Sequence, residues 1–178
     1  MQVLKLTKKD FKKADGYWSD YIGKTDVSDY DGHIEIAGNL GWVRFNSISA
    51  EGHLWAEAGS GIEAGWGIKA GWGIKAGWGI KAGEGIEAGE GIVSGLAVAC
   101  KLTLNFNYKL FAGVAWWRSN AENTVTCGKL ENGTVAYGEL VETGLPDELK
   151  TPESINIGGK DYEVTPELKD ALKKLKEL

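Results

Sequence analysis

Residues 61–95 read GIEAGWGIKAGWGIKAGWGIKAGEGIEAGEGIVSG, a six-residue unit of the form Gly-Ile-Lys/Glu-Ala-Gly-Trp/Glu. Isoleucine, alanine and Trp/Glu occupy three phases of this unit, and all three phases fall on even-numbered positions. Because side chains alternate between the two faces of a strand, a period of six keeps each phase on a constant face. A short repeat of this kind indicates stacked, self-similar backbone, so it predicts the fold and not a catalytic pocket.

The pattern extends beyond the repeat. The isoleucine phase that starts at Ile62 continues through Val98 and Leu104 to Leu110. Residues 32–117 are therefore predicted to form one β-rich element in which the glycines mark repeated turns. We expect a mainly β chain with a β-solenoid (β-helix) architecture. A strongly twisted antiparallel sheet or sandwich is the alternative, because it would show the same alternation.

The six-residue unit resembles one side of the triangular coil in hexapeptide-repeat β-helix proteins, whose coils have about eighteen residues. The resemblance covers about half of the chain, and it implies that isoleucines stack on isoleucines in successive coils. It also implies that residues of opposite charge face each other between neighbouring coils, which stabilises cross-strand pairs. The opposed pairs are Glu63 with Lys81 and Lys69 with Glu87.

The Trp/Glu phase is the candidate contact surface. Were it to face the interior, Glu84 and Glu90 would be buried without partners, so we expect isoleucine inside and the Trp/Glu phase at a corner or outside. Trp66, Trp72 and Trp78 would then form a ring around one coil. Such a ring is either a contact band or the packing site for flanking segments. In an extended sheet, the indoles would instead form a stacking platform for sugars or bases.

Smaller elements are predicted on both sides of the repeat. Residues 1–31 are expected to form an N-terminal cap with a short helix that starts at Thr7. Residues 118–149 are expected to form a β-hairpin extension. Its tight turn is predicted at Asn132-Gly133, because Asn-Gly is the strongest short hairpin signal.

Residues 150–178 are predicted to contain a second hairpin around Gly158-Gly159 and a terminal α-helix that begins after Thr165. The helix carries one apolar stripe, which either packs on the preceding hairpin or docks on a partner. The residues of this stripe are Leu168, Leu172 and Leu175.

Composition argues against several classes of function. The 178 residues carry a net charge of −5, which argues against direct nucleic-acid binding through a basic surface. The chain has no apolar run long enough for a transmembrane helix and no secretory signal after Met1, so we expect a cytoplasmic location without membrane contact. Cys100 and Cys127 are expected to be buried or half-buried thiols in a reducing compartment.

Residues with catalytic chemistry are few. His33 and His53 are the two histidines of the chain; neither accompanies a nucleophile motif, and His53 is expected on a solvated strand face. Asp26, Asp29 and Asp31 alternate like calcium ligands, but the glycine and distal glutamate of an EF-hand loop are missing. We therefore expect no enzyme activity, catalytic residue, metal site or cofactor.

The favoured function is a non-enzymatic protein-binding module that contacts a protein partner through the Trp/Glu phase and the C-terminal helix. Small acidic proteins without an active site resemble accessory proteins of phages and mobile elements, including anti-CRISPR-type inhibitors of host machines. The first alternative is a self-associating structural β-solenoid, similar to a filament or phage-fibre component. A carbohydrate-binding surface is the second alternative. An acyltransferase would need His33 or His53 to act without supporting residues.

Overall fold

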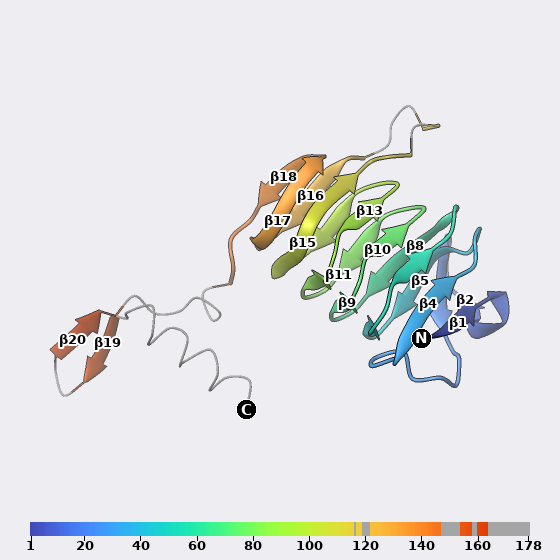
Figure 1. Cartoon of the computed structure of the whole chain (residues 1–178), viewed down its shortest axis with the longest axis horizontal. Coiled ribbons are helices and arrows are strands. Elements are labelled where there is room, and N and C mark those ends of the chain that lie inside the picture. Colours follow the sequence, from blue (N-terminus) through green and yellow to red (C-terminus); the bar gives the residue numbers. More distant parts are fainter. Residues whose placement is uncertain (116, 119–121, 147–153, 158–159, 164–178) are drawn as a thin grey trace. The chain divides into compact units, whose positions relative to one another are not determined.

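The computed structural model is mainly β, and most of its strands pair in parallel within two curled sheets (Figure 1). The chain divides into two units, Met1–Leu145 and Pro146–Leu178. The structure describes residues 1–115, 117–118, 122–146, 154–157 and 160–163.

The repeat forms short strands separated by glycine-flanked corners. The strands are β8 (Ser60–Ala64), β9 (Ile68–Ala70), β10 (Ile74–Ala76), β11 (Ile80–Ala82), β12 (Ile86–Ala88), β13 (Ile92–Ser94) and β14 (Val98–Cys100). Strands β9 to β13 each begin at the isoleucine and end at the small residue two positions later. These two side chains face the interior, and the residue between them faces outward.

From β8 to β12, each strand pairs in parallel with the third strand before it and the third strand after it. β13 and β14 also pair with the third strand before them, but their later neighbours are β15 and β16. Ile80 is in register with Ile62 on β8 and with Val98 on β14, eighteen residues away in either direction. Ile86 is likewise in register with Ile68. The predicted eighteen-residue stacking is therefore confirmed within the repeat, and the antiparallel alternative is wrong there.

The strands of the first unit fall into three parallel rows. The first strand row holds β1 (Gln2–Leu6), β4 (Gly32–Ile36), β7 (Leu54–Ala56), β10 and β13. The second holds β6 (Ile48–Ala50), β9 and β12. The third holds β3 (Trp18–Tyr21), β5 (Gly41–Phe45), β8, β11, β14, β16 (Thr124–Cys127) and β18 (Glu139–Glu142).

Two longer strands join the first and second rows. The ten-residue β15 (Thr103–Ala112) pairs first with β12 and then with β13, and β17 (Lys129–Tyr137) follows it along both halves. The first two rows therefore belong to one sheet, whereas the third row is a separate sheet.

The isoleucine and alanine phases form the core, as expected. Their side chains are at most 2% exposed, so the repeat removes a continuous column of apolar surface from water. The buried isoleucines are Ile62, Ile68, Ile74, Ile80, Ile86 and Ile92.

Both cysteines lie in this core, which confirms that they are buried thiols. Burial, with a smaller effect of the neighbouring Cys127, raises the pKa of Cys100 to about 12. Burial, with a smaller effect of Glu142, raises the pKa of Cys127 to about 11. Since the thiolate is the nucleophilic form, neither residue is suited to nucleophilic chemistry in the folded protein.

The predicted N-terminal helix is wrong beyond a single turn. The 3-10 helix η1 spans only Lys8–Asp10, capped where the Thr7 backbone N–H donates to Asp10 Oδ2 over 2.7 Å. Strand β2 (Phe11–Lys13) follows directly and pairs antiparallel with β3. Phe11 is buried edge-to-face against Phe45, with ring centroids 5.8 Å apart. Packing onto the end of the third row therefore overrides the local helix signal.

The predicted hairpin at Asn132-Gly133 is also wrong. Strand β17 runs through both residues, and its pairing with β15 is parallel. Gly133 has a φ of 104° and lies against the Phe106 ring, where a Cβ would collide. Asn132 Nδ2 donates to Asn107 Oδ1 over 3.2 Å. The Asn-Gly pair thus bends β17 around the corner that β15 also turns, instead of reversing the chain.

The second predicted hairpin is confirmed. Strand β19 (Ser154–Ile157) pairs antiparallel with β20 (Lys160–Glu163). The predicted terminal helix and its stripe of Leu168, Leu172 and Leu175 lie outside the described residues. The segment boundaries predicted after residues 31, 117 and 149 stay predictions. Within the described residues, no helix is long and apolar enough to span a membrane.

Candidate functional site

The three repeat tryptophans lie at three different corners. Trp66 separates β8 from β9, Trp72 separates β9 from β10, and Trp78 separates β10 from β11. Glu84 and Glu90 stack on the first two corners, because their backbone N–H groups donate to the Trp66 and Trp72 carbonyls over 3.1 Å. The structure therefore spreads these five residues around the molecule instead of gathering them into one surface. Their role in binding stays a prediction.

The environments of the three indoles differ. Trp66 is 65% exposed and Trp72 48% exposed, whereas Trp78 is half-buried. Tyr17 packs edge-on against Trp78 with ring centroids 6.1 Å apart, and the Arg118 guanidinium lies 5.8 Å from the same ring. Trp78 therefore serves mainly to pack flanking segments, which is one of the two roles expected for the ring of tryptophans.

The outward residues of the second and third rows are mostly polar, and several form ion pairs between neighbouring strands. Lys69 Nζ lies 3.3 Å from Glu87 Oε2 on the second row. On the third row, Lys81 Nζ lies 3.5 Å from Glu63 Oε1. Both pairs are those predicted from the repeat. These two rows therefore present a solvated surface whose charges already have partners.

The outward residues of the first row are different. On β7, β10 and β13, and on the halves of β15 and β17 that continue the same row, these outward residues form a line that we call the apolar face. Trp55 is 44% exposed, Phe111 36% and Tyr137 52%. Because neighbouring strands lie about 4.8 Å apart, the line is about 19 Å long. The apolar face consists of Trp55, Lys75, Val93, Phe111 and Tyr137, from β7, β10, β13, β15 and β17.

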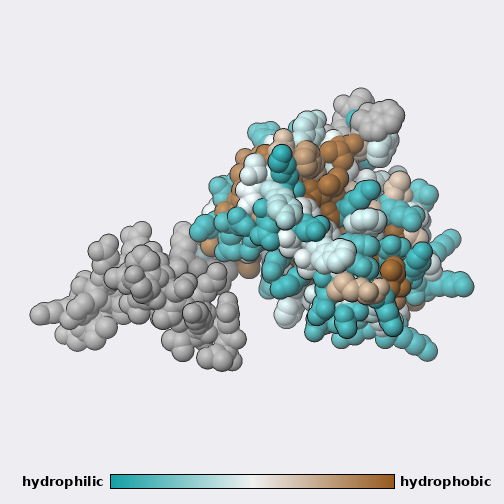
Figure 2. All heavy atoms as spheres, in the orientation of Figure 1, coloured by the Kyte–Doolittle hydropathy of each residue, from teal (hydrophilic) through white to brown (hydrophobic). Residues whose placement is uncertain are grey.

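A shallow groove of about 510 Å³ lies along the apolar face. Tyr108, which is 67% exposed, stands at the β15 corner beside it, and Lys109 and Glu90 complete its polar rim. Figure 2 shows hydrophobic residues grouped over the part of the first unit where β13 and β15 lie. The groove offers apolar contact area and few hydrogen-bonding groups, so it suits binding better than catalysis.

The Trp55 indole is held in place by a stack of two histidine rings. Its ring stacks on His53 with centroids 4.1 Å apart, and His53 stacks on His33 at the same distance. The His53 backbone N–H donates to His33 Nδ1 over 3.0 Å, and His53 Nε2 lies 3.5 Å from Glu35 Oε1. His53 therefore does not lie on a freely solvated face, contrary to expectation.

The His53 imidazole favours its neutral form. Burial lowers the pKa of His53, the neighbouring His33 lowers it further, and Glu35 partly opposes both effects. A neutral imidazole stacks on an indole without bringing a charge into this partly buried layer. The histidine pair is thus a support for Trp55.

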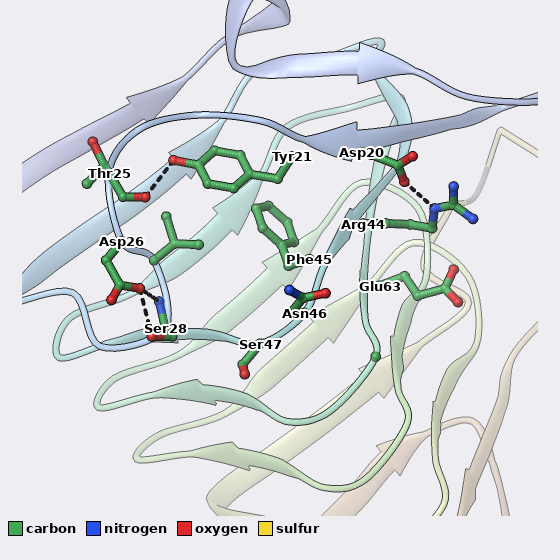
Figure 3. A pocket seen from close by; sticks show the side chains of 12 residues that line it. Asp20, Tyr21, Thr25, Asp26, Ser28, Arg44, Phe45, Asn46, Ser47 and Glu63 are labelled. Atoms are coloured by element: carbon green, nitrogen blue, oxygen red, sulfur yellow. Dashed lines mark hydrogen bonds and ion pairs between the residues drawn. The ribbon is translucent and has the colours of Figure 1, made fainter.

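A second cavity of about 620 Å³ lies beside β3, β5 and the loop at residues 25–28 (Figure 3). Glu63 Oε1 lies 3.5 Å from Lys81 Nζ, whereas Glu63 Oε2 is buried without a hydrogen-bond partner among the described residues. The other charged groups are paired: Arg44 Nε donates to Asp20 Oδ1 over 2.6 Å, and Asp26 Oδ1 accepts from the Ser28 hydroxyl over 2.7 Å. That hydrogen bond lowers the pKa of Asp26. The described residues hold no cluster of three or more histidine, cysteine or acidic side chains suited to a metal ion.

Comparisons with protein-family models, curated proteins and solved structures give no match for this chain. The assignment of a site therefore depends on geometry alone. The apolar face was missed in the sequence, although a signal for part of it is present. Lys75, Val93 and Phe111 are eighteen residues apart, so the step that stacks the isoleucines would also have aligned these outward residues.

Proposed function

We propose that the first unit is a β-solenoid of the hexapeptide-repeat type and that the chain is a non-enzymatic protein-binding module. Its contact surface is the apolar face. The observation that carries this proposal is the contrast between rows. The second and third rows present mostly polar residues, several in ion pairs, whereas the first row exposes Trp55, Phe111 and Tyr137 in one line. A contiguous apolar surface of this kind is typical of interaction sites.

The ladder of parallel strands supports this proposal. Residues of the apolar face lie on strands that pair on both sides or, for Tyr137, on one side with the long β15. Binding to such a framework requires little ordering of the backbone, which leaves more of the contact energy for affinity. The narrower hypothesis is a cytoplasmic inhibitor of a host macromolecular machine, of the anti-CRISPR type.

The test is affinity capture with two matched variants of β15. Phe111→Lys places a charge on the apolar face, and Asn105→Lys makes the same change at an outward position six residues earlier on the second row. Circular dichroism first establishes that both variants fold. A stoichiometric protein captured by the wild type and by Asn105→Lys, but lost with Phe111→Lys, is the expected result. Equal capture by both variants would contradict the proposal.

The same capture experiment tests the residues predicted from the repeat. Trp66→Ala and Trp72→Ala remove exposed indoles at two corners without touching the core. If the apolar face alone carries binding, Trp66→Ala leaves capture unchanged. Trp72→Ala weakens it only through the edge contact of Trp72 with His33, whose centroids lie 5.0 Å apart.

A self-associating structural β-solenoid is the second candidate. The observation in its favour is that β18, among the described strands, has a strand neighbour on one side only, and its side chains are exposed. Exposed strand edges pair readily with a second chain. Light scattering over a hundredfold range of protein concentration separates the two candidates. A mass that stays monomeric throughout would contradict self-association.

A further inference from the structure

Three lysines occupy equivalent positions in successive repeats, but one of them has a different environment. Lys69 and Lys81 each form an ion pair with a glutamate on a neighbouring strand. The strand neighbours of Lys75 are Trp55 and Val93, and it forms no ion pair with any described residue. Lys69 and Lys81 can therefore serve as controls for substitutions of Lys75, because they occupy the equivalent position in other repeats.

Lys75 therefore places a positive charge without a carboxylate partner within the apolar face, between Trp55 and Val93. Its Nζ lies 5.7 Å from the centroid of the Trp55 ring, and a cation–π contact of this kind is weak while water covers the site. A partner that covers the face removes this water. An ammonium group left without an anion would then oppose binding strongly.

The rim of the groove also carries a positive charge without an ion-pair partner in the described part of the chain. Lys109, an outward residue of β15 beside Thr134, forms no ion pair with the described residues. Glu90 is the one carboxylate along the groove. Two cations against one anion favour a partner that brings negative charge to an otherwise apolar contact.

We infer that the apolar face binds a protein segment that carries a carboxylate between apolar side chains, with the carboxylate paired to Lys75. This inference rests on the proposed function. Val93 and Phe111 favour aliphatic and aromatic side chains of the partner, and the surface that lines the groove is mainly apolar. The carboxylate sets specificity, because apolar segments without it would bury Lys75 uncompensated.

The experiment is a selection of displayed random twelve-residue peptides on the full-length protein. The bait proteins are the wild type, Lys75→Glu and, as the matched control, Lys69→Glu. Wild-type and Lys69→Glu baits are expected to enrich peptides that combine Asp or Glu with apolar residues. Lys75→Glu is expected to enrich peptides with Lys or Arg instead and to bind the wild-type peptides at least tenfold more weakly.

The remaining outcomes separate the inference from the proposed function. Peptides that lose binding with Phe111→Lys but show no acidic preference would overturn the role of Lys75 and leave the binding face intact. Peptides that bind equally to wild type and Phe111→Lys would overturn the proposed function itself. Retention of an oligogalacturonate probe that depends on Lys75, in the absence of such peptides, would reassign the face to an acidic carbohydrate.

Discussion

At the scale of single residues, the glycines decide how closely the backbone corners stack. A Cβ on Gly83 would fall onto the carbonyl oxygen of Gly65, in the corner that stacks on it from eighteen residues earlier. A Cβ on Gly67 would lie 3.7 Å from the nearest atom, the Gly85 carbonyl oxygen. The two glycines occupy related corner positions, but only one of them has room for a side chain.

Gly83→Ala is therefore expected to lower the free energy of unfolding by about 1–3 kcal/mol, because the corner must shift to admit the methyl group. Gly67→Ala is the control and should change it by less than about 1 kcal/mol, since the methyl group fits and alanine reduces the freedom of the unfolded chain. Urea denaturation measures both. If Gly83→Ala were as stable as Gly67→Ala, the corner at Gly83 could move away from the stacked corner at Gly65 without cost, which would contradict this prediction.

The depressed pKa of His53 predicts a dependence of stability on pH. Burial and His33 lower this pKa below its ordinary value of 6.5, so the unfolded chain takes up a proton before the folded protein does. The contribution of His53 to the free energy of unfolding should therefore decrease as the pH falls from 6.5 through the folded-state pKa and level off below it. Above 6.5 this contribution is fully present.

The measurement is urea denaturation at several pH values, paired with NMR titration of the His53 ring. His53→Gln is the control, because it removes the titrating group while retaining polarity. As the pH falls, the free energy of unfolding of the wild type should decrease relative to that of His53→Gln. A difference that is independent of pH, or a His53 pKa at 6.5 or above, would contradict the neutral histidine support.

At the scale of strands, stability resides in the stacked isoleucines more than in the charged residues between them. Ile80 is 1% exposed and lies between Ile62 and Val98, so Ile80→Ala should lower the free energy of unfolding by about 2–5 kcal/mol. Lys69→Ala, at the equivalent outward position of β9, removes an exposed ion pair with Glu87 and should cost less than about 1 kcal/mol. Thermal and urea unfolding would show the difference, and equal losses would contradict it.

Strand pairing also explains which elements could be predicted from the sequence. The strands of the repeat were predictable because two independent signals agree there: alternation places Ile80 and Ala82 inside, and the eighteen-residue step stacks them on Ile62 and Ala64. The turn at Asn132-Gly133 and the helix after Thr7 had only a local signal. In both places pairing with a distant strand outweighed local preference, which a single sequence does not display.

At the scale of the whole molecule, the candidate site arises from coiling of the chain, which is why it was hard to predict. Trp55 is in register with Lys75 at a distance of twenty residues, not eighteen. The longer step continues from Leu54 to Ile34. No constant period therefore leads from the repeat to Trp55, and the apolar face becomes visible only when the strand pairing is known.

The arrangement of three strand rows predicts the effects of deletions within the repeat. Removing residues 66–83 joins Gly65 to Glu84, so β12 should take the place of β9 and every later strand should keep its row. Val93 should then become the strand neighbour of Trp55 at about 4.8 Å. Removing only residues 66–71 also preserves the six-residue phase, but it should move each later strand to a different row and separate Val93 from Trp55.

Introduced cysteines can measure this rearrangement without knowledge of a partner. With Trp55→Cys and Val93→Cys present, the eighteen-residue deletion should form a disulfide under mild oxidation, because neighbouring strands place the two Cα atoms within bonding range. The six-residue deletion and the undeleted chain, in which β10 separates the two positions, should not form it. Both deletions should fold, since the isoleucines still stack. A disulfide in the six-residue deletion would contradict the return of the chain after three strands, on which the rows and the apolar face both depend.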